Sequence, residues 1–290
     1  VGFDFVGTVM ESTCNSLRPG DCVVGTAPPM TGSFSEFILV PHDFCSRPFT
    51  NPQSAEILKQ LACVPLAGLT ASQILNEFSV GVGDHVLVIG ASGGVGHIAV
   101  QLAKMRGCRV TAICSRKNHG FVKRLGADHI VDYCSEEWFS KVTTAVSQYG
   151  LFQMYSLYLS TLTPGSVIDT VTSGETRDRR MQYPKRLESL VNRPLGKYVC
   201  IGGNTVAWVL AHLKRFLGLD IFPANRTLHW VRFPHATDDL SRLADLILKE
   251  KLKISIHKEY SLTQRGIEDA CRDQLSRRTI GKNVIRIGRG

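Results

Sequence analysis

The chain has 290 residues, of which 43% are hydrophobic, and a formal charge of +9 from 34 Lys and Arg against 25 Asp and Glu. This apolar fraction is sufficient for packed cores and argues against an intrinsically disordered chain. The length allows one large domain or two ordinary ones. The positive charge suits anionic ligands, but no helix-turn-helix, zinc finger or RNA-binding signature accompanies it in the sequence, so nucleic acid is not expected as a partner.

The nine cysteines are odd in number, and no two are spaced as C-x-x-C. A disulfide framework is therefore not expected, and a reducing compartment is predicted. No run reaches about 18 uninterrupted apolar residues, so no transmembrane segment is predicted. The sequence begins Val1-Gly2-Phe3 inside a strand-like pattern with no signal peptide, which is typical of a processed chain, a truncated chain or a part of a longer protein.

Residues 1–48 alternate short β-branched runs with turns and are predicted as all-β, with strands in FVGTVM (5–10), DCVVG (21–25) and FSEFILV (34–40). From about residue 66 helical and strand-like patterns alternate. The predicted strands there are 85–89, 109–114, 129–131, 166–171 and 197–201, and the predicted helices are 70–78, 94–105, 118–125, 136–148 and 237–249. This alternation predicts a parallel sheet with right-handed crossovers.

The remaining segments are of two kinds. The tail is predicted to form a strand at 254–260, a helix at 264–275 and a strand at 283–287. The apolar segment 206–222 is interpreted as a core or pocket-lining helix, with a lid, a dimer contact or a membrane-surface helix as alternatives. Its charged residues interrupt it too soon for a membrane span.

A glycine-rich turn, ASGGVG over residues 91–96, joins the strand at 85–89 to the helix at 94–105. Compared with G-x-G-x-x-G, Ala91 replaces the first glycine, and Gly93 and Gly96 match the second and third. In this pattern the second glycine lets a pyrophosphate approach the backbone, the third lets the helix pack on the strand, and amides at the helix start hold phosphates. A purely structural turn is the alternative, which the complete strand–turn–helix context disfavours.

The end of the next strand indicates which dinucleotide the turn would bind. An NAD site needs an acidic residue about 20 positions after the turn, where it binds the ribose hydroxyls. Here the strand ends Cys114-Ser115-Arg116-Lys117, with a hydroxyl, two cations and no carboxylate. Such a site accommodates a 2′-phosphate, so NADPH is the predicted cofactor. The alternative for Arg116 and Lys117 is that they are solvated residues at a helix start.

Eight stretches carry a resemblance to a known family, in the family's order: GFDFVGTV (2–9), RPGDCVVG (18–25), GSFSEFILVP (32–41), PLAGLTA (65–71), GASGGVGHIAVQLAK (90–104), VTAICSRKNHGFVKRLGADHIVDY (110–133), GKYVCIGG (196–203) and IGKNVIRI (280–287). Together they resemble the medium-chain dehydrogenase/reductase superfamily, specifically its zinc-independent quinone oxidoreductase branch. That branch includes zeta-crystallin-like and chloroplast-envelope quinone oxidoreductase-like proteins.

The resemblance implies an α/β protein of two domains. Residues 68–252 would form a Rossmann domain with a doubly wound parallel sheet. Residues 1–67 and 253–290 would form a GroES-like β-rich catalytic domain that is N-terminally truncated, since the family carries roughly 50–70 residues before the G-x-D-F motif. The apolar stretch 151–164 matches the family poorly and is interpreted as an insertion or as the product of a mis-spliced gene model.

The resemblance also implies where the cofactor binds. Expected pyrophosphate contacts come from the turn, at Ser92, Gly93, Gly94, Val95 and Gly96. Expected adenosine-side contacts are Ser115, Arg116, Lys117 and Tyr133, and expected nicotinamide-side contacts are Thr70, Gly202 and Gly203.

Two sequence features bear on the chemistry. Zinc-dependent relatives have a histidine in a G-H-E-x-x-G segment, whereas this chain has Phe3 at that position and no group of four closely spaced cysteines, so no metal is expected. No motif assigns a catalytic side chain, and His97 is interpreted as a surface or packing residue.

The predicted activity is hydride transfer from NADPH to a quinone or an α,β-unsaturated carbonyl. Such acceptors need positioning, exclusion of water and hydrogen bonds to the developing oxyanion, but no metal to stabilise an alkoxide. The alternatives are a non-catalytic NADPH-binding subunit or sensor with the same fold, and an enoyl reductase in a biosynthetic pathway. A homodimer that acts on a small molecule is expected, in the cytoplasm or in a mitochondrion or chloroplast.

Overall fold

The computed structural model describes residues 2–28, 31–48, 50, 52, 54–77, 79–152, 166–169, 197–201, 226–228, 236–276 and 278–288. The chain divides into two compact units: unit 1 comprises Val1–Ser72, Gly93–Ile98 and Val231–Gly290, and unit 2 comprises Gln73–Ser92 and Ala99–Trp230. The domain boundaries expected from the sequence stay a prediction. Residues 153–164 of the expected insertion and the predicted helix at 206–222 lie outside the described residues.

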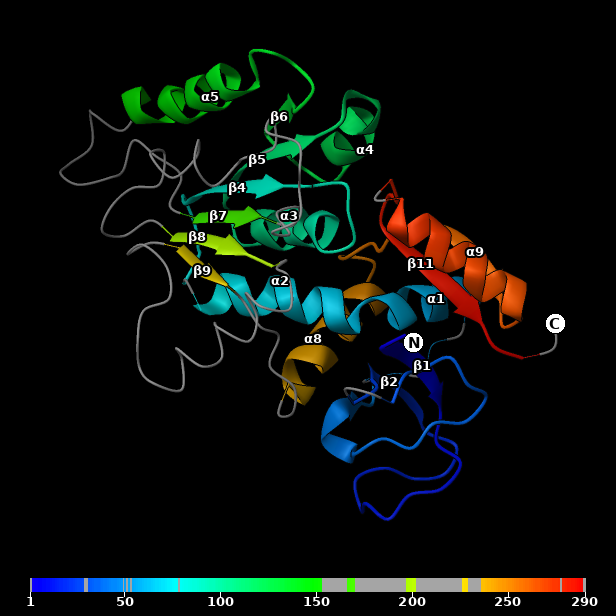
Figure 1. Cartoon of the computed structure of the whole chain (residues 1–290). Helices are drawn as coiled ribbons and strands as arrows, with labels where there is room; N and C mark the ends of the chain where they lie inside the picture. The colour runs from blue at the N-terminus through cyan, green and yellow to red at the C-terminus, as the bar shows by residue number, and fades with distance from the viewer. Residues whose placement is uncertain are drawn as a thin grey trace, which may run out of the picture. The chain divides into compact units, whose positions relative to one another are not determined.

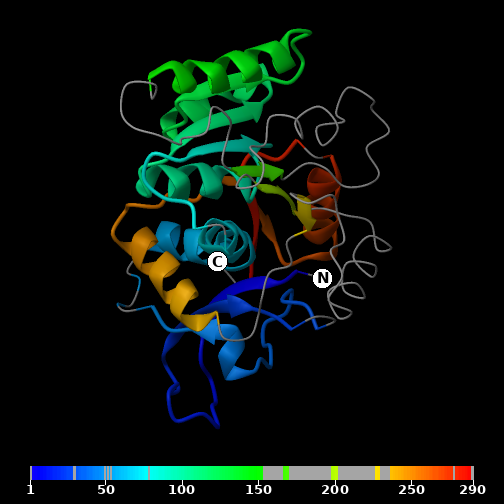
Figure 2. The ribbon, with the colours of Figure 1, turned by 90° about the vertical axis from the view of Figure 1, so that its left-hand side faces the viewer.

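Unit 2 is built on a six-stranded parallel sheet with the strand order β6-β5-β4-β7-β8-β9 (Figures 1 and 2). Counted from β4, this is the order 3-2-1-4-5-6 of doubly wound folds, which confirms the predicted sheet. The strands are β4 (His85–Ile89), β5 (Arg109–Cys114), β6 (His129–Asp132), β7 (Ser166–Asp169), β8 (Lys197–Cys200) and β9 (Arg226–Leu228).

The centre of this sheet is β4, in which all five residues are buried. Val86 is aligned with Val110 of β5 on one side and with Ser166 of β7 on the other. The strand order reverses at β4, and in open α/β sheets ligands bind outside the carboxyl ends of the strands at such a point. The helices of unit 2 include η2 (Arg116–Asn118), α4 (His119–Arg124) and α5 (Trp138–Phe152), while α3 (Gly96–Met105) begins in unit 1 and ends in unit 2.

Unit 1 contains an antiparallel sheet of order β1-β2-β3 and a separate parallel pair, β10 and β11. A helix, α9, connects the two parallel strands. The elements are β1 (Asp4–Thr8), β2 (Cys22–Thr26), η1 (His42–Phe44), β3 (Cys45–Ser46), α1 (Ala55–Cys63), α2 (Pro65–Glu77, which continues into unit 2), α8 (Thr237–Leu248), β10 (Ile256–Ser261), α9 (Gln264–Leu275) and β11 (Lys282–Arg286).

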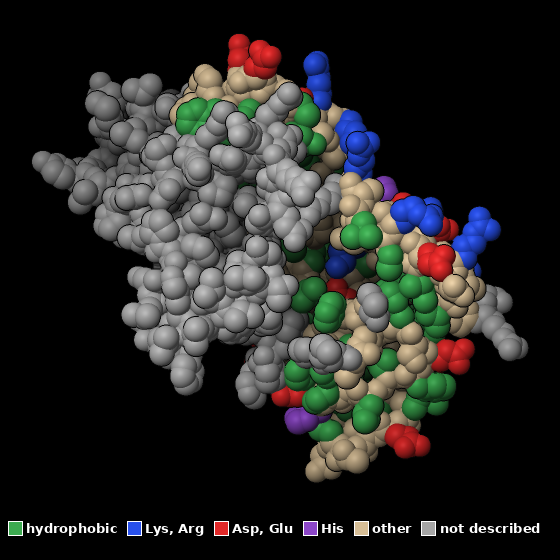
Figure 3. Space-filling view, viewed as in Figure 1, with side chains coloured by type: hydrophobic (Ala, Val, Ile, Leu, Met, Phe, Trp, Pro, Cys, Tyr) green, Lys and Arg blue, Asp and Glu red, His purple; other side chains and the backbone are tan. Residues whose placement is uncertain are grey.

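The predicted strand at residues 34–40 is wrong. This segment is irregular, and Phe37 and Leu39 are 71% and 94% exposed. Apolar side chains accordingly show on the visible face of unit 1 (Figure 3). Alternating apolar residues indicate a strand only where one face of it is buried, and here they do not face a core.

Among the described residues, no single helix has the length and apolar composition to cross a bilayer, and only the bent pair α1 and α2 meets both criteria jointly.

Candidate functional site

The turn after β4 leaves the sheet at its carboxyl end and leads directly into α3. Gly90 has a φ of +74°, in the left-handed region that favours glycine. The amides of Gly90 and Ala91 both donate to the carbonyl oxygen of Ile113 in β5, at 3.0 and 3.1 Å. Ala91 is fully buried, so the position of the first motif glycine accepts a methyl group here.

The start of α3 presents backbone N–H groups. The carbonyl of Gly93 accepts the amide of His97 at 3.1 Å and therefore points into the helix. Within the part of the chain that the structure describes, the amides of Gly94, Val95 and Gly96 have no hydrogen-bond acceptor. Such open amides at a helix N-terminus, together with the helix dipole, favour binding of an anion.

Lys282 of β11 lies against this turn within unit 1. A Cβ atom at Gly94 would be 3.2 Å from Cδ of Lys282 and 3.5 Å from the carbonyl oxygen of Gly281. A glycine at position 94 therefore leaves room for the lysine stem. The stem of Lys282, a residue that the sequence analysis did not single out, therefore lies against Gly94.

Asp4 of β1 holds this lysine. Its Oδ2 accepts a hydrogen bond from Nζ of Lys282 at 3.2 Å, and its Oδ1 accepts the amide of Leu66, in the first turn of α2, at 2.9 Å. Burial raises the pKa of Asp4, and Lys282 partly offsets that rise. Burial alone would lower the pKa of Lys282, but Asp4 and Cys63 together outweigh burial and raise it. Asp4 is the single charge of β1, whereas β11 carries both Lys282 and Arg286, so the sequence alone does not identify this pair.

Ser92, the last turn residue in unit 2, is held by Asn118 of η2. Nδ2 of Asn118 donates to Oγ of Ser92 at 2.9 Å, which leaves the Ser92 hydroxyl proton available for another acceptor. Asn118 is 6% exposed, and its Oδ1 has no partner among the described residues. The sequence analysis missed Asn118, although it is the polar residue that follows the two cations.

The segment after β5 is an exposed dibasic stretch. Ser115 is the extended residue before η2, and Arg116 and Lys117 are both exposed. Figure 3 shows Lys and Arg side chains along the edge of unit 2 where α4 lies. Asp132, at the end of the neighbouring strand β6, accepts the amide of Cys134 at 3.0 Å and so caps its own turn.

The structure gives no cofactor-related contact for the other expected cofactor residues that it describes. Tyr133 directly follows β6 and is half-buried. Thr70 is buried in α2, and its hydroxyl donates to the carbonyl of Leu66 at 2.7 Å. Gly202 and Gly203 lie outside the described residues. The cofactor contacts of all these residues stay predictions.

The known proteins to which this chain is similar include dehydrogenases and oxidoreductases. A family profile described as "Zinc-binding dehydrogenase" matches residues 94–185. The chloroplastic quinone-oxidoreductase homolog of Spinacia oleracea is 36% identical over 157 residues, 51% of this chain and 46% of that protein. The structure of the quinone oxidoreductase from Coxiella burnetii is similar over 99% of this chain and 79% of that one, with a TM-score of 0.74 and 26% identity.

These similarities support the resemblance to the medium-chain dehydrogenase/reductase superfamily that the sequence predicted. The spinach and Coxiella proteins support its quinone oxidoreductase branch. A further relative, the trans-enoyl reductase pgmF of Aspergillus terreus, is 27% identical over 300 aligned positions, 99% of this chain and 76% of that protein. The spinach match covers less than half of that relative's length.

Zinc does not fit the residues that the structure describes. Phe3, at the position of the histidine in zinc-dependent relatives, has no ligating atom and is 49% exposed. The described ranges contain no group of three or more His, Cys, Asp or Glu residues that could hold a metal ion.

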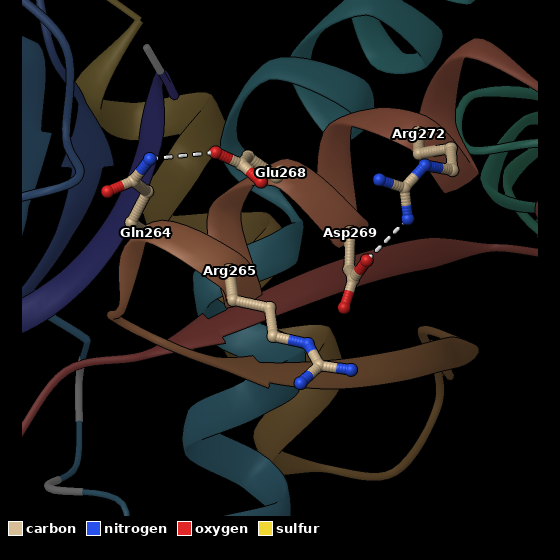
Figure 4. A pocket seen from close by; sticks show the side chains of 5 residues that line it. All are labelled: Gln264, Arg265, Glu268, Asp269 and Arg272. Atoms are coloured by element: carbon tan, nitrogen blue, oxygen red, sulfur yellow. Dashed lines mark hydrogen bonds and ion pairs between the residues drawn. The ribbon is translucent and has the colours of Figure 1, made fainter.

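The outer face of α9 forms a shallow hollow lined by five polar side chains (Figure 4). These side chains largely pair with one another: Gln264 donates to Glu268 at 3.0 Å, and Arg272 donates to Asp269 at 2.6 Å. Pairs of this kind, three and four residues apart, are typical of a solvated helix face. The hollow has no part in the candidate site.

Two buried histidines predict a loss of stability in acid. Burial lowers the pKa of both His85 and His97 from 6.5 to about 4. The unfolded chain therefore binds a proton below pH 6.5 that the folded chain does not bind until about pH 4, so the free energy of unfolding falls as the pH drops through this range. Each histidine is expected to contribute a loss of about 2 kcal/mol between pH 7 and pH 5.

The variant His85→Gln tests this expectation. Its amide can still contact Oγ1 of Thr111, which lies 2.8 Å from Nε2 of His85, but it cannot titrate. Chemical denaturation at pH 7 and pH 5 should show a pH dependence reduced by about 2 kcal/mol in the variant. An equal pH dependence in both proteins would show that His85 titrates normally.

Proposed function

We propose that the protein is an NADPH-dependent oxidoreductase that transfers a hydride to a quinone or an α,β-unsaturated carbonyl. The proposal rests first on the turn of residues 90–96, which presents three open amides directly after the central strand of a doubly wound sheet. The names of the relatives support the reaction class, since two are quinone oxidoreductases or homologs and one is a trans-enoyl reductase.

The preference for NADPH over NADH rests on the residues after β5. Ser115, Arg116 and Lys117 offer a hydroxyl and two exposed cations, which suit a 2′-phosphate. Asp132 ends β6 and not β5, the strand after which an NAD site carries its acidic residue, and its Oδ1 accepts the amide of Cys134 in its own turn.

The residues of the turn would hold the pyrophosphate. The amides of Gly94, Val95 and Gly96 would donate to phosphate oxygens, and so would the Ser92 hydroxyl, because Asn118 already donates to its oxygen. The stem of Lys282 would support the turn at Gly94, while its ammonium stays paired with Asp4. Thr70, Tyr133, Gly202 and Gly203 are proposed as further cofactor contacts, on the resemblance alone.

The bound nicotinamide would supply a hydride to an electron-poor acceptor. The protein's part is to orient the two reactants, exclude water and offer hydrogen bonds to the developing oxyanion, and a proton then comes from water or a hydroxyl group. No side chain is assigned as the acid. A homodimer and a cytoplasmic, mitochondrial or chloroplast location stay predictions.

An enoyl reductase is the second candidate, because the fungal trans-enoyl reductase matches 99% of this chain. A non-catalytic NADPH-binding subunit or sensor is the third. The three differ in turnover: a quinone or enone reductase consumes NADPH with small conjugated acceptors, an enoyl reductase prefers enoyl thioesters, and a sensor binds NADPH without consuming it.

The experiment combines binding and turnover. NADPH binding is followed by fluorescence, and NADPH oxidation is measured with 1,4-benzoquinone, 9,10-phenanthrenequinone, a simple enone and an enoyl thioester. We expect saturable oxidation with at least one quinone or with the enone. Tight NADPH binding with no turnover of any acceptor would reject the enzyme, and turnover of the thioester alone would favour the second candidate.

A further inference from the structure

His97 is the second residue of α3 and is fully buried within unit 1. Its Nδ1 lies 2.8 Å from the carbonyl oxygen of Gly93, one helical turn earlier. Its Nε2 accepts a hydrogen bond from the amide of Ser255, 158 residues away along the chain, at 3.3 Å. The imidazole therefore connects the glycine turn to the segment that leads into β10.

These two contacts select one form of the ring. A carbonyl oxygen only accepts, so Nδ1 carries the proton, and a backbone amide only donates, so Nε2 carries the lone pair. A protonated ring would point an N–H group at the amide of Ser255. Burial is the main cause that lowers the pKa of the ring, and the ammonium of Lys282 lowers it further, while the backbone of Gly93 and Gly94 partly offsets both. The neutral ring with the proton on Nδ1 satisfies both contacts.

The segment that His97 contacts also holds Lys282. The carbonyl oxygen of Ser255 accepts the amide of Lys282 at 2.9 Å. Gly281 has a φ of +72°, and a Cβ atom there would overlap that same carbonyl, so the two chain segments approach closely. Ser255 thus connects to Lys282 through its carbonyl and to the glycine turn through His97.

Gly93 and Gly94 are both glycines, and glycine has the widest choice of backbone conformations. A peptide plane flip between them would turn the Gly93 carbonyl outward, toward the position proposed for the pyrophosphate. In the structure that carbonyl accepts both the amide and the ring of His97, and both bonds keep it directed into the helix.

We propose that His97 is a positioning residue for the cofactor: its Nδ1–H keeps the Gly93 carbonyl away from the phosphates, and its Nε2 keeps the turn in register with Lys282. The ring touches no reacting atom. This inference rests on the proposed function, because the ligand positioned is the pyrophosphate of NADPH.

Three substitutions separate the two contacts. His97→Asn places its amide near the Nδ1 position and keeps only the bond to Gly93. His97→Gln reaches the Nε2 position and keeps only the bond to Ser255. His97→Leu fills the space and removes both. The control is His85→Gln, which alters a buried histidine of unit 2 that contacts Thr111 and not the turn.

The Kd for NADPH is expected to rise about tenfold in His97→Leu, as the loss of one or two hydrogen bonds implies, with smaller rises in the Asn and Gln variants. The kcat at saturating NADPH is expected to change by less than about twofold, since positioning acts on binding. The control should leave the Kd unchanged. A structural role alone would lower stability in all four variants and leave the Kd at the wild-type value.

A measurement on the unsubstituted protein covers the case in which His97→Leu does not fold. Nitrogen-15 spectra of the histidine rings should show His97 with its proton on Nδ1 from pH 8 to pH 5. A proton on Nε2, or titration near pH 6.5, would overturn the inference. Wild-type protein that binds no NADPH would contradict the proposed function, whereas tight wild-type binding that the three His97 variants share would contradict this inference alone.

Discussion

Simultaneous replacement of Arg116 and Lys117 by alanine will reduce the preference for NADPH over NADH by about 10- to 100-fold, because hydrogen bonds between charged groups are among the strongest in proteins. The Kd for NADH is expected to stay near its wild-type value, since NADH has no 2′-phosphate. Fluorescence titration with both cofactors measures the ratio. The effect should shrink at high salt, because both side chains are exposed and their charges are screened.

A matched control lies one element further along the chain. Lys123 and Arg124 are also adjacent, basic and exposed, but they end α4 and do not follow a strand of the sheet. Replacing both by alanine removes the same charge from unit 2 and should leave the cofactor preference intact. If the Arg116→Ala/Lys117→Ala variant keeps its preference, or if both double variants lose it equally, the assignment of the 2′-phosphate to this segment is wrong.

Replacement of Asp4 by leucine will destabilise the protein by about 3–5 kcal/mol, the usual cost of leaving one member of a buried ion pair without its partner. The Asp4 and Lys282 side chains are 10% and 23% exposed. The variant also removes the acceptor for the amide of Leu66 at the start of α2. Chemical denaturation at pH 7 measures the loss.

Two further variants separate the effect of charge from the effect of packing, one at an exposed ion pair and one at the Asp4–Lys282 pair. Arg47→Ala breaks an ion pair of unit 1 in which the arginine is 55% exposed, and it should leave the free energy of unfolding nearly unchanged. The double variant Asp4→Leu/Lys282→Met should be more stable than Asp4→Leu alone, because no uncompensated charge remains. Equal stability of these two proteins would show that the cost comes from packing.

The regular elements were predictable because their patterns are local. The apolar run at 85–89 and the helical spacing at 264–275 agree with β4 and α9. The glycine turn was predictable for the same reason, since a strand, a turn and a helix follow one another within about 20 residues. The strand at 34–40 failed because its alternation of apolar residues does not correspond to a buried face.

The supports of the turn could not be predicted, because they depend on contacts between distant parts of the chain. Asp4 and Lys282 are 278 residues apart, and His97 and Ser255 are 158 residues apart. Periodicity carries no information on such pairs. Asp4 is the single charge of β1 and needs a partner when it is buried, but only the contact with Lys282 in unit 1 identifies that partner.

Direct hydride transfer is tested most directly with NADPH that carries deuterium at C4 of the nicotinamide, prepared in each of its two stereochemical forms, and an enone as acceptor. We predict that one of the two forms slows NADPH oxidation and leaves deuterium on the β-carbon of the reduced product. The other form should do neither. Consumption of NADPH with no deuterium in the product from either form, or no consumption at all, would contradict the proposed activity.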